Sequence, residues 1–153
     1  MAKIDAILLD SGGRDCAVAR ALVDDTYNII ARLTYTYGGE VWQHRTDVPL
    51  GVTAIAVDDL GDHDEVYGHI GVLVERVIQK ATELGVNVVI AGYREPWPMC
   101  EKQYMESGCN LVGPVVGYTD EQITQACVDN GIEYTQFVIT VNGRDSTHSN
   151  VTT

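Results

Sequence analysis

A short segment with two consecutive glycines follows the first apolar run of the chain and has the residue types of an anion-binding turn. The sequence Asp-Ser-Gly-Gly-Arg-Asp-Cys spans residues 10–16, between the apolar run Ile4–Leu9 and a helix-like run at 17–25. Glycine accepts the backbone angles that turn successive N–H groups toward one anion, and a helix start adds unpaired N–H groups and a positive dipole end. The segment therefore predicts an anion-binding loop. The alternative is a tight strand-to-helix turn that binds nothing.

Residues 11–16, Ser-Gly-Gly-Arg-Asp-Cys, resemble the pyrophosphate-binding loop Ser-Gly-Gly-x-Asp-Ser of the PP-loop ATP pyrophosphatases, the adenine nucleotide alpha-hydrolase-like superfamily. The resemblance implies that the chain binds ATP and Mg²⁺ through this loop. It implies that the backbone N–H groups of Gly12, Gly13 and Arg14 hold pyrophosphate. By the same resemblance, Ser11 donates a hydrogen bond to pyrophosphate, and Asp15 orients the loop or the metal ion at the phosphates.

Cys16, the last residue of this loop, departs from the superfamily pattern, which usually has serine there. The resemblance still places Cys16 among the residues that contact the nucleotide. A thiol is a weaker hydrogen-bond donor than a hydroxyl group, so one phosphate contact is weakened or lost. The loop therefore supports nucleotide binding better than it supports turnover.

The length and composition of the chain predict one compact domain. The 153 residues, 45% of them hydrophobic, are enough to bury a sizeable core, and we expect a single domain over residues 1–141 with a loose polar tail at 142–153. No run of about 18 apolar residues is present, and Asp5 interrupts the N-terminal region where a signal peptide needs its apolar stretch. We therefore expect a soluble, cytoplasmic protein without a membrane partner. The cysteines lack metal-ligand spacing, and Cys100, Cys109 and Cys127 are expected to be buried as small hydrophobic residues.

The charge balance bears on the partners of the protein. With 22 acidic and 10 basic residues, the formal net charge is −12. Such a surface repels nucleic-acid backbones and anionic membranes, so nucleic acid is a disfavoured partner, although tRNA is not excluded. An excess of aspartate with few lysines is also typical of proteins from salt-loving organisms, which suggests a halophilic host as a hypothesis.

Short β-branched runs alternate with helical periodicity along the chain, which predicts an α/β fold. We expect a three-layer sandwich around a mainly parallel sheet of five or six strands, Rossmann-like and of the HUP class, with strand order 3-2-1-4-5. The five strands are predicted at 4–9, 27–35, 52–57, 86–91 and 110–112, with a last strand at 134–141. Helices are predicted to follow residue 16 and to span 64–84, 99–107 and 119–130, and an irregular crossover is predicted at 36–51.

This strand order reverses between the first and fourth strands, where open α/β sheets bind their ligands beyond the carboxyl ends of the strands. The loops at 11–16 and 92–97 are therefore expected to meet. Gly92 would lie close to the nucleotide, Arg94 has the planar fork that clamps phosphate oxygens, and Glu95 could orient a nucleophile, hold Mg²⁺ or act as a base. The alternative is a surface Arg–Glu pair in front of a Pro-Trp-Pro turn.

Two further stretches carry weaker indications. Residues 92–141 look like the second half of the diphthine–ammonia ligase branch of the superfamily, through Leu-Val-Gly-Pro at 111–114 and Tyr-Thr-Asp-Glu at 118–121, although the usual Gly-Asp is Gly-Tyr at 92–93. At the end of the second strand, PP-loop proteins present backbone groups and an apolar wall to adenine. The resemblance thus assigns Thr34 and Tyr35 to the nucleotide site, with Tyr35 or Tyr37 as a stacking face. Ordinary packing of these tyrosines is the alternative.

Three functions are compatible with these patterns. The first is an enzyme that hydrolyses ATP to AMP and pyrophosphate to adenylate an unknown acceptor for amidation or ligation, with Asp15, Arg94 and Glu95 as catalytic residues. The second is a non-catalytic or weakly catalytic nucleotide-binding sensor or subunit. The third is a universal-stress-type nucleotide-binding protein. A homo-oligomer is expected if a second subunit supplies a wall of the site.

Overall fold

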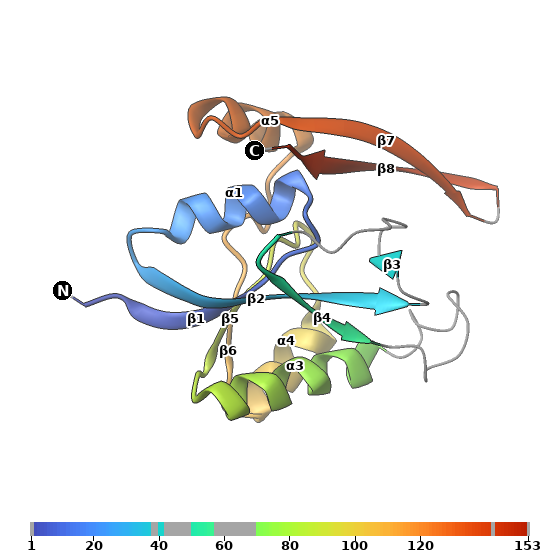
Figure 1. The fold of residues 1–153 in the computed structure, drawn as a ribbon. Coiled ribbons are helices and arrows are strands. Elements are labelled where there is room, and N and C mark those ends of the chain that lie inside the picture. The colour runs from blue at the N-terminus through green and yellow to red at the C-terminus, as the bar shows by residue number, and fades with distance from the viewer. Residues whose placement is uncertain (1, 38–39, 42–49, 57–69, 142, 153) are drawn as a thin grey trace.

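The computed structural model describes residues 2–37, 40–41, 50–56, 70–141 and 143–152. A central parallel sheet contains β1 (Ile4–Leu9), β2 (Tyr27–Tyr37), β4 (Val52–Ala56), β5 (Val88–Ile90) and β6 (Asn110–Val112). Their spatial order is β4-β2-β1-β5-β6 (Figure 1). This confirms the predicted order 3-2-1-4-5 and the Rossmann-like α/β class.

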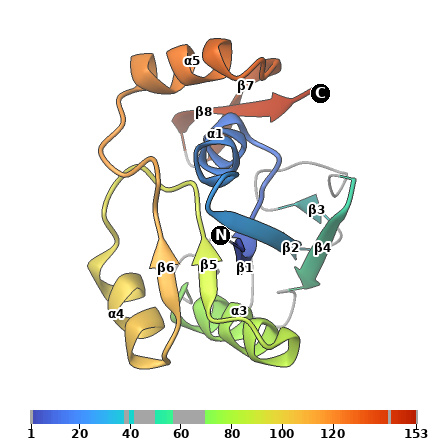
Figure 2. The same cartoon turned by 90° about the vertical axis from the view of Figure 1, so that its left-hand side faces the viewer.

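Helices cover both faces of this sheet (Figure 2). The helices α1 (Arg14–Val23) and α5 (Asp120–Asp129) lie on one side, and α3 (Ile70–Leu84) and α4 (Pro98–Glu106) lie on the other. Because successive side chains of a strand point to opposite faces, β1 serves two cores. Ala6 and Leu8 pack with residues of α1 and α5, whereas Ile7 packs with residues of α3 and α4. The three-layer arrangement follows from this alternation.

The capping box predicted at the start of the helix at 119–130 is confirmed. At the start of α5, the Thr119 side chain accepts a hydrogen bond from the Gln122 backbone at 3.1 Å, and the Gln122 side chain accepts one from the Thr119 backbone at 2.8 Å. Of the helix predicted at 64–84, residues 70–84 are described, and 64–69 lie outside the described residues. The strand β2 extends two residues beyond the predicted end at Tyr35, and β3 (Glu40–Val41) pairs with it in antiparallel orientation within the predicted irregular crossover.

The C-terminal region is an antiparallel hairpin of β7 (Tyr134–Val141) and β8 (Arg144–Val151), separate from the main sheet. The expected loose tail from residue 142 is therefore wrong. The β8 sequence is almost entirely polar and has no apolar alternation that would predict a strand. Its pairing with β7 holds it in place. The base of the hairpin reaches residues 11–16, which we call the glycine loop. There the Val151 N–H donates to the Gly12 carbonyl oxygen at 2.9 Å.

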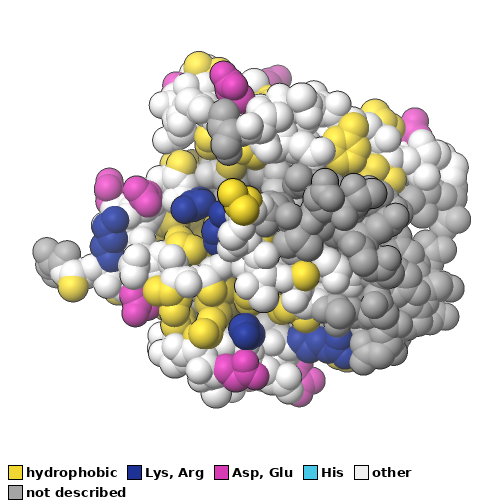
Figure 3. Space-filling model, in the orientation of Figure 1, with side chains coloured by type: hydrophobic (Ala, Val, Ile, Leu, Met, Phe, Trp, Pro, Cys, Tyr) yellow, Lys and Arg dark blue, Asp and Glu magenta, His cyan; other side chains and the backbone are white. Residues whose placement is uncertain are grey.

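On the face shown in Figure 3, the described acidic side chains are dispersed, and some of them lie beside Lys or Arg side chains. Within the described ranges, no helix combines the length and the apolar character that a membrane crossing requires. The cysteines Cys100, Cys109 and Cys127 are buried as predicted.

Candidate functional site

The loops that follow β1 and β5 line one cavity of about 1190 Å³, which we call the main cavity. Ser11, Asp15 and Cys16 line it from the first loop, and the segment from Gly92 to Trp97 lines it from the second. Their meeting point is the carboxyl end of the central strands, where the strand order reverses. The structure therefore brings together the two loops that the sequence predicted to meet.

Gly92 allows this close approach. A Cβ atom at Gly92 would lie 2.8 Å from the Cys16 backbone nitrogen and 2.9 Å from the Asp15 carbonyl oxygen. Such distances are shorter than a van der Waals contact, and both partners are backbone atoms of the first turn of α1. Glycine is thus required at position 92 for contact between the loops, whether or not Gly92 touches a ligand.

The glycine loop is held from inside the protein by Asp10, which is only 6% exposed. Its Oδ1 accepts a hydrogen bond from the Gly12 N–H at 2.8 Å. Its Oδ2 accepts two from Arg32, from Nη2 at 2.6 Å and from Nε at 2.9 Å. Asp10 and Arg32 are therefore positioning residues that the sequence analysis did not assign. In the sequence, Asp10 is a charged residue directly after an apolar strand, and Arg32 is a charged residue within the next strand.

Arg14 faces away from the main cavity. Its backbone N–H donates to Ser149 Oγ of β8 at 2.9 Å. Its guanidinium group donates to Thr124 Oγ1 at 3.1 Å and to the Tyr134 hydroxyl at 3.2 Å, and it pairs with Asp120. Burial tends to lower the pKa of Arg14, but the bond to Tyr134 and the charge of Asp120 raise it overall, so the group remains charged. Arg14 is therefore a buried link between the loop, α5 and the hairpin.

These bonds bear on the expected role of the loop backbone. The N–H groups of Gly12 and Arg14 already have acceptors and would have to leave them to hold pyrophosphate, so the role of Gly12, Gly13 and Arg14 in binding pyrophosphate stays a prediction. Intrahelical bonds of α1 begin with Ala17, whose N–H donates to the Gly13 carbonyl oxygen. The N–H groups of Asp15 and Cys16 precede that bond in the first turn and have no partner within the helix.

Asp15 and Arg94, two of the predicted catalytic residues, contact each other. Arg94 Nε lies 3.3 Å from Asp15 Oδ2, and Arg94 Nη1 lies 3.5 Å from Asp120 Oδ1. Burial raises the pKa of Asp15, although the charges of Arg94 and Arg14 lower it. The other carboxylate oxygen of Asp15, Oδ1, is buried without a hydrogen-bond partner and lies 3.9 Å from Arg14 Nε. Glu95, the third predicted catalytic residue, is exposed at the edge of the main cavity.

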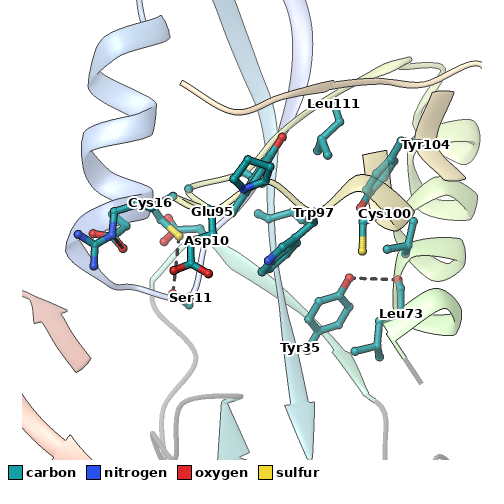
Figure 4. A pocket seen from close by; sticks show the side chains of 18 of the residues that line it. Asp10, Ser11, Cys16, Tyr35, Leu73, Glu95, Trp97, Cys100, Tyr104 and Leu111 are labelled. Carbon is teal, nitrogen blue, oxygen red and sulfur yellow. Dashed lines mark hydrogen bonds and ion pairs between the residues drawn. The ribbon is translucent and has the colours of Figure 1, made fainter. Parts of the chain in front are cut away.

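Cys16 lies at the loop end of the main cavity, where its Sγ is 3.6 Å from Ser11 Oγ (Figure 4). Burial raises the pKa of the Cys16 thiol to about 11, and the charge of Asp10 adds to this effect. A thiol with so high a pKa is protonated at neutral pH and is a poor nucleophile. Cys16 is therefore a neutral hydrogen-bonding group next to Ser11.

The opposite end of the main cavity is apolar and aromatic. The Tyr35 hydroxyl donates to the Leu73 carbonyl oxygen of α3 at 3.0 Å, which fixes its ring as a wall (Figure 4). Thr34 also lines the cavity and is buried, and its contact with a nucleotide stays a prediction. The Tyr37 side chain lies outside the described residues. The sequence analysis did not assign the remaining apolar lining residues of this end, which include Trp97, Cys100, Tyr104 and Leu111. Trp97, Cys100 and Tyr104 come from α4 and the residue before it, and Leu111 comes from β6; no motif in the sequence identifies them.

A second cavity of about 520 Å³, which we call the polar cavity, lies between the glycine loop and the C-terminal hairpin. The hairpin contributes Gln136, Thr147, His148 and Ser149. His148 is half-buried and stacks on Phe137 with ring centroids 5.9 Å apart. Five lining residues belong to both cavities and so form their common wall: Ser11, Asp15, Cys16, Gly92 and Arg94.

Comparisons with known proteins identify the fold. No protein-family model and no curated protein matches the chain. Among solved structures, the chain is similar to a protein from Methanocaldococcus jannaschii described as a predicted subunit of tRNA methyltransferase. The TM-score is 0.64 at 11% sequence identity, and the match covers 97% of each chain. At this identity the similarity shows a shared Rossmann-like α/β fold.

Proposed function

We propose that this protein binds ATP, with the phosphates at the loop of residues 11–16 and the nucleoside in the main cavity. One observation carries the proposal: the two loops at the strand-order reversal line a single cavity that has a helix start at one end and aromatic walls at the other. Ligands of open α/β sheets bind at this reversal, and a helix start favours phosphate groups. A nucleotide needs both an anion site and an apolar wall, and it is the ligand class that matches both ends.

The finer proposal is that the chain cleaves ATP between the α- and β-phosphates and transfers AMP to an acceptor. Arg94 lies on the common wall of the two cavities, where its guanidinium group can neutralise charge on the phosphates. The unpartnered Oδ1 of Asp15 is a suitable ligand for phosphate-bound Mg²⁺, and a bound Mg²⁺ would supply further charge neutralisation. Glu95, exposed at the edge of the main cavity, is placed to orient the acceptor or to take up its proton.

Two classes of acceptor are candidates for the proposed transfer of AMP. The similarity in fold to a protein described as a tRNA methyltransferase subunit makes tRNA one acceptor to test. The net charge of −12 opposes nucleic-acid binding. Small carboxylic acids with ammonia form the other class to test, because adenylated carboxylates react with amines.

Product analysis tests the proposed reaction. ATP labelled at the α-phosphate is incubated with the protein, Mg²⁺ and each acceptor class, and labelled AMP with free pyrophosphate is expected. The Arg94→Met variant should lose this activity, whereas the exposed control Arg20→Met on α1 should keep it. Release of ADP instead of AMP would contradict the proposed cleavage. Failure of ATP to bind at all would contradict the whole proposal.

The second candidate function is a nucleotide-binding module without turnover. The observation that favours it is the state of Arg94, which pairs with the carboxylates of both Asp15 and Asp120. An arginine held by two carboxylates must exchange at least one of them for phosphate before it can act. Under this alternative, ATP raises the melting temperature, and neither the natural chain nor the Cys16→Ser variant releases AMP with any acceptor.

A further inference from the structure

The hairpin forms one wall of the polar cavity and is fastened directly to the glycine loop. Ser149 Oγ accepts from the Arg14 N–H at 2.9 Å, and the Val151 N–H donates to the Gly12 carbonyl oxygen at 2.9 Å. Ser149 is 8% exposed, and Arg14 is 6% exposed. The contact between loop and hairpin is therefore a built part of the fold rather than a chance approach of a tail.

One face of the hairpin points its polar side chains toward this cavity. In the β7–β8 register, Gln136 pairs with Ser149, and Val138 pairs with Thr147. Because side chains alternate along a strand, Gln136, Thr147 and Ser149 share one face. Ser149 is bonded to the loop, and all three residues line the polar cavity, which His148 from the other face also lines. This face thus supplies an amide and two hydroxyl groups opposite the loop.

The arrangement of the two cavities indicates which part of a nucleotide would reach the hairpin. The five residues of their common wall include Arg94 and the first turn of α1. A nucleotide whose base lies at the aromatic end of the main cavity would bring its first phosphate to this common wall. The phosphates that follow would then lie next to the polar cavity, whose lining includes the same five residues.

The charges of the polar cavity suit a metal-bound polyphosphate. Arg14 and Arg94 contribute two positive charges, and Asp15 and Asp120 contribute two negative ones. A bare anion gains little net attraction from a neutral pocket. A polyphosphate that carries Mg²⁺ needs guanidinium donors for its oxygens and a carboxylate for the cation. Arg94 and Asp15 line the pocket and can serve in these two roles, whereas the Arg14 guanidinium group is held by Thr124, Tyr134 and Asp120.

We infer that the C-terminal hairpin binds the β- and γ-phosphates of the nucleotide, through Gln136 and Thr147 on the face that covers the glycine loop. This inference rests on the proposed nucleotide function. It assigns to the hairpin a positioning role for the pyrophosphate part of ATP and none for the adenosine part. AMP binding should therefore be independent of the hairpin face.

The test compares substitutions on the two faces of the hairpin, with threonine replaced by valine on each face and Gln136 replaced as well on the cavity face. Thr147→Val combined with Gln136→Leu alters the cavity face, and Thr135→Val alters the opposite face, where Thr135 pairs with Asn150. Binding of ATP with Mg²⁺, of inorganic pyrophosphate with Mg²⁺ and of AMP is measured by calorimetry. The cavity-face variant should bind ATP and pyrophosphate about tenfold more weakly, the effect of losing one or two hydrogen bonds, with unchanged AMP affinity. The opposite-face variant should match the natural chain with all three ligands.

The outcomes separate this inference from the proposed function. If the natural chain binds ATP and the cavity-face variant binds it equally well, the hairpin inference is overturned and the nucleotide function stands. An equal loss of AMP and ATP affinity would also overturn it, because the hairpin would then act on the whole site. If the natural chain binds neither ATP nor AMP, both proposals fail together.

Discussion

The glycine loop and the C-terminal hairpin enclose the same polar cavity but are held in place differently. The loop is fixed from the core, through buried Asp10 and its bonds to Gly12 and Arg32, and by the close approach of Gly92. The hairpin is a two-stranded sheet attached at its base by the Arg14 side chain, by the bond from the Arg14 N–H to Ser149 Oγ, and by the bond from the Val151 N–H to the Gly12 carbonyl oxygen. Two-stranded sheets are marginal on their own, so the hairpin depends on this attachment. Changes at the loop should therefore lower the stability of the whole protein, and changes at the attachment should act most strongly on the hairpin.

The largest effect is expected at Gly92. In Gly92→Ala, the new Cβ meets backbone atoms of Asp15 and Cys16 at 2.8–2.9 Å, and backbone cannot rotate away as a side chain can. We expect a loss of about 2 kcal/mol in the free energy of unfolding, typical of overpacking, together with loss of ATP binding. Urea unfolding and calorimetry measure the two effects.

The matched control for this change is Gly13→Ala. A Cβ at Gly13 would have its nearest neighbours at 3.5 Å, an ordinary contact. Gly13 has a φ angle of −83°, which alanine adopts without strain. If Gly13→Ala lowers the free energy of unfolding as much as Gly92→Ala does, then steric contact between the loops does not explain the requirement for glycine at position 92.

The next effect is expected at Arg14, which joins the two regions. Arg14→Met keeps an unbranched apolar stem but removes the guanidinium group and its bonds to Thr124, Tyr134 and Asp120. We expect a loss of about 1–2 kcal/mol in unfolding free energy and faster hydrogen exchange at the Val151 amide as the hairpin detaches. The control Arg20→Met changes an exposed arginine of the same helix. Unchanged exchange throughout β8 in Arg14→Met would show that the hairpin does not need this link.

A smaller, pH-dependent effect is expected at Asp15. Burial raises the pKa of its carboxyl group in the folded state, so the folded state favours the protonated form. The ionised group therefore destabilises the protein at neutral pH, and stability decreases as the pH rises through this raised pKa. Asp15→Asn should be more stable than the natural chain at pH 7, and this difference should disappear as the pH falls toward 3.8, the ordinary pKa of an aspartate.

The unfolding free energies of both proteins between pH 4 and 8 test this prediction about Asp15, with the exposed Asp25→Asn as control. The same Asp15→Asn variant should bind ATP with Mg²⁺ more weakly, because the amide is a poorer ligand for Mg²⁺ than the carboxylate. A variant that is less stable than the natural chain at every pH would show that the ion pair with Arg94 outweighs the burial of Asp15.

The smallest effect on stability is expected at Cys16. Cys16→Ser replaces a protonated thiol beside Ser11 with a hydroxyl group, and we expect a change of less than about 1 kcal/mol in unfolding free energy. Affinity for ATP should rise severalfold because a hydroxyl group is the stronger donor. Thiol labelling of the natural chain at pH 8 should leave Cys16 largely unmodified. Rapid labelling would contradict the raised pKa.

The glycine loop depends on residues near it in the sequence, and the hairpin depends on distant ones. This difference explains how far the sequence could predict the structure. The loop combines apolar strand, glycines and helix start within a dozen residues, so its place in the fold and its meeting with Gly92 followed from local pattern and strand order. The capping box at Thr119 was read in the same way. These features depend on neighbours in the sequence.

The hairpin and the loop hydrogen bonds depend on distant residues instead. Ser149 lies 135 positions from its partner Arg14, and nothing near either residue in the sequence indicates the other. The acceptors of the Gly12 and Arg14 N–H groups could therefore not be foreseen, and polar β8 had no apolar alternation to mark it as a strand. Asp10 and Arg32 were visible as charges at apolar strands, but their pairing required the register of β1 and β2.

The central claim is that the loop and the hairpin form one phosphate site, and amide-resolved NMR tests it most directly. Spectra of the natural chain are compared without ligand, with AMP, and with ATP and Mg²⁺. The account predicts that ATP with Mg²⁺ shifts amide signals of both 11–16 and 147–151, whereas AMP leaves 147–151 unchanged. Shifts in the loop with ATP and none in the hairpin would contradict the claim.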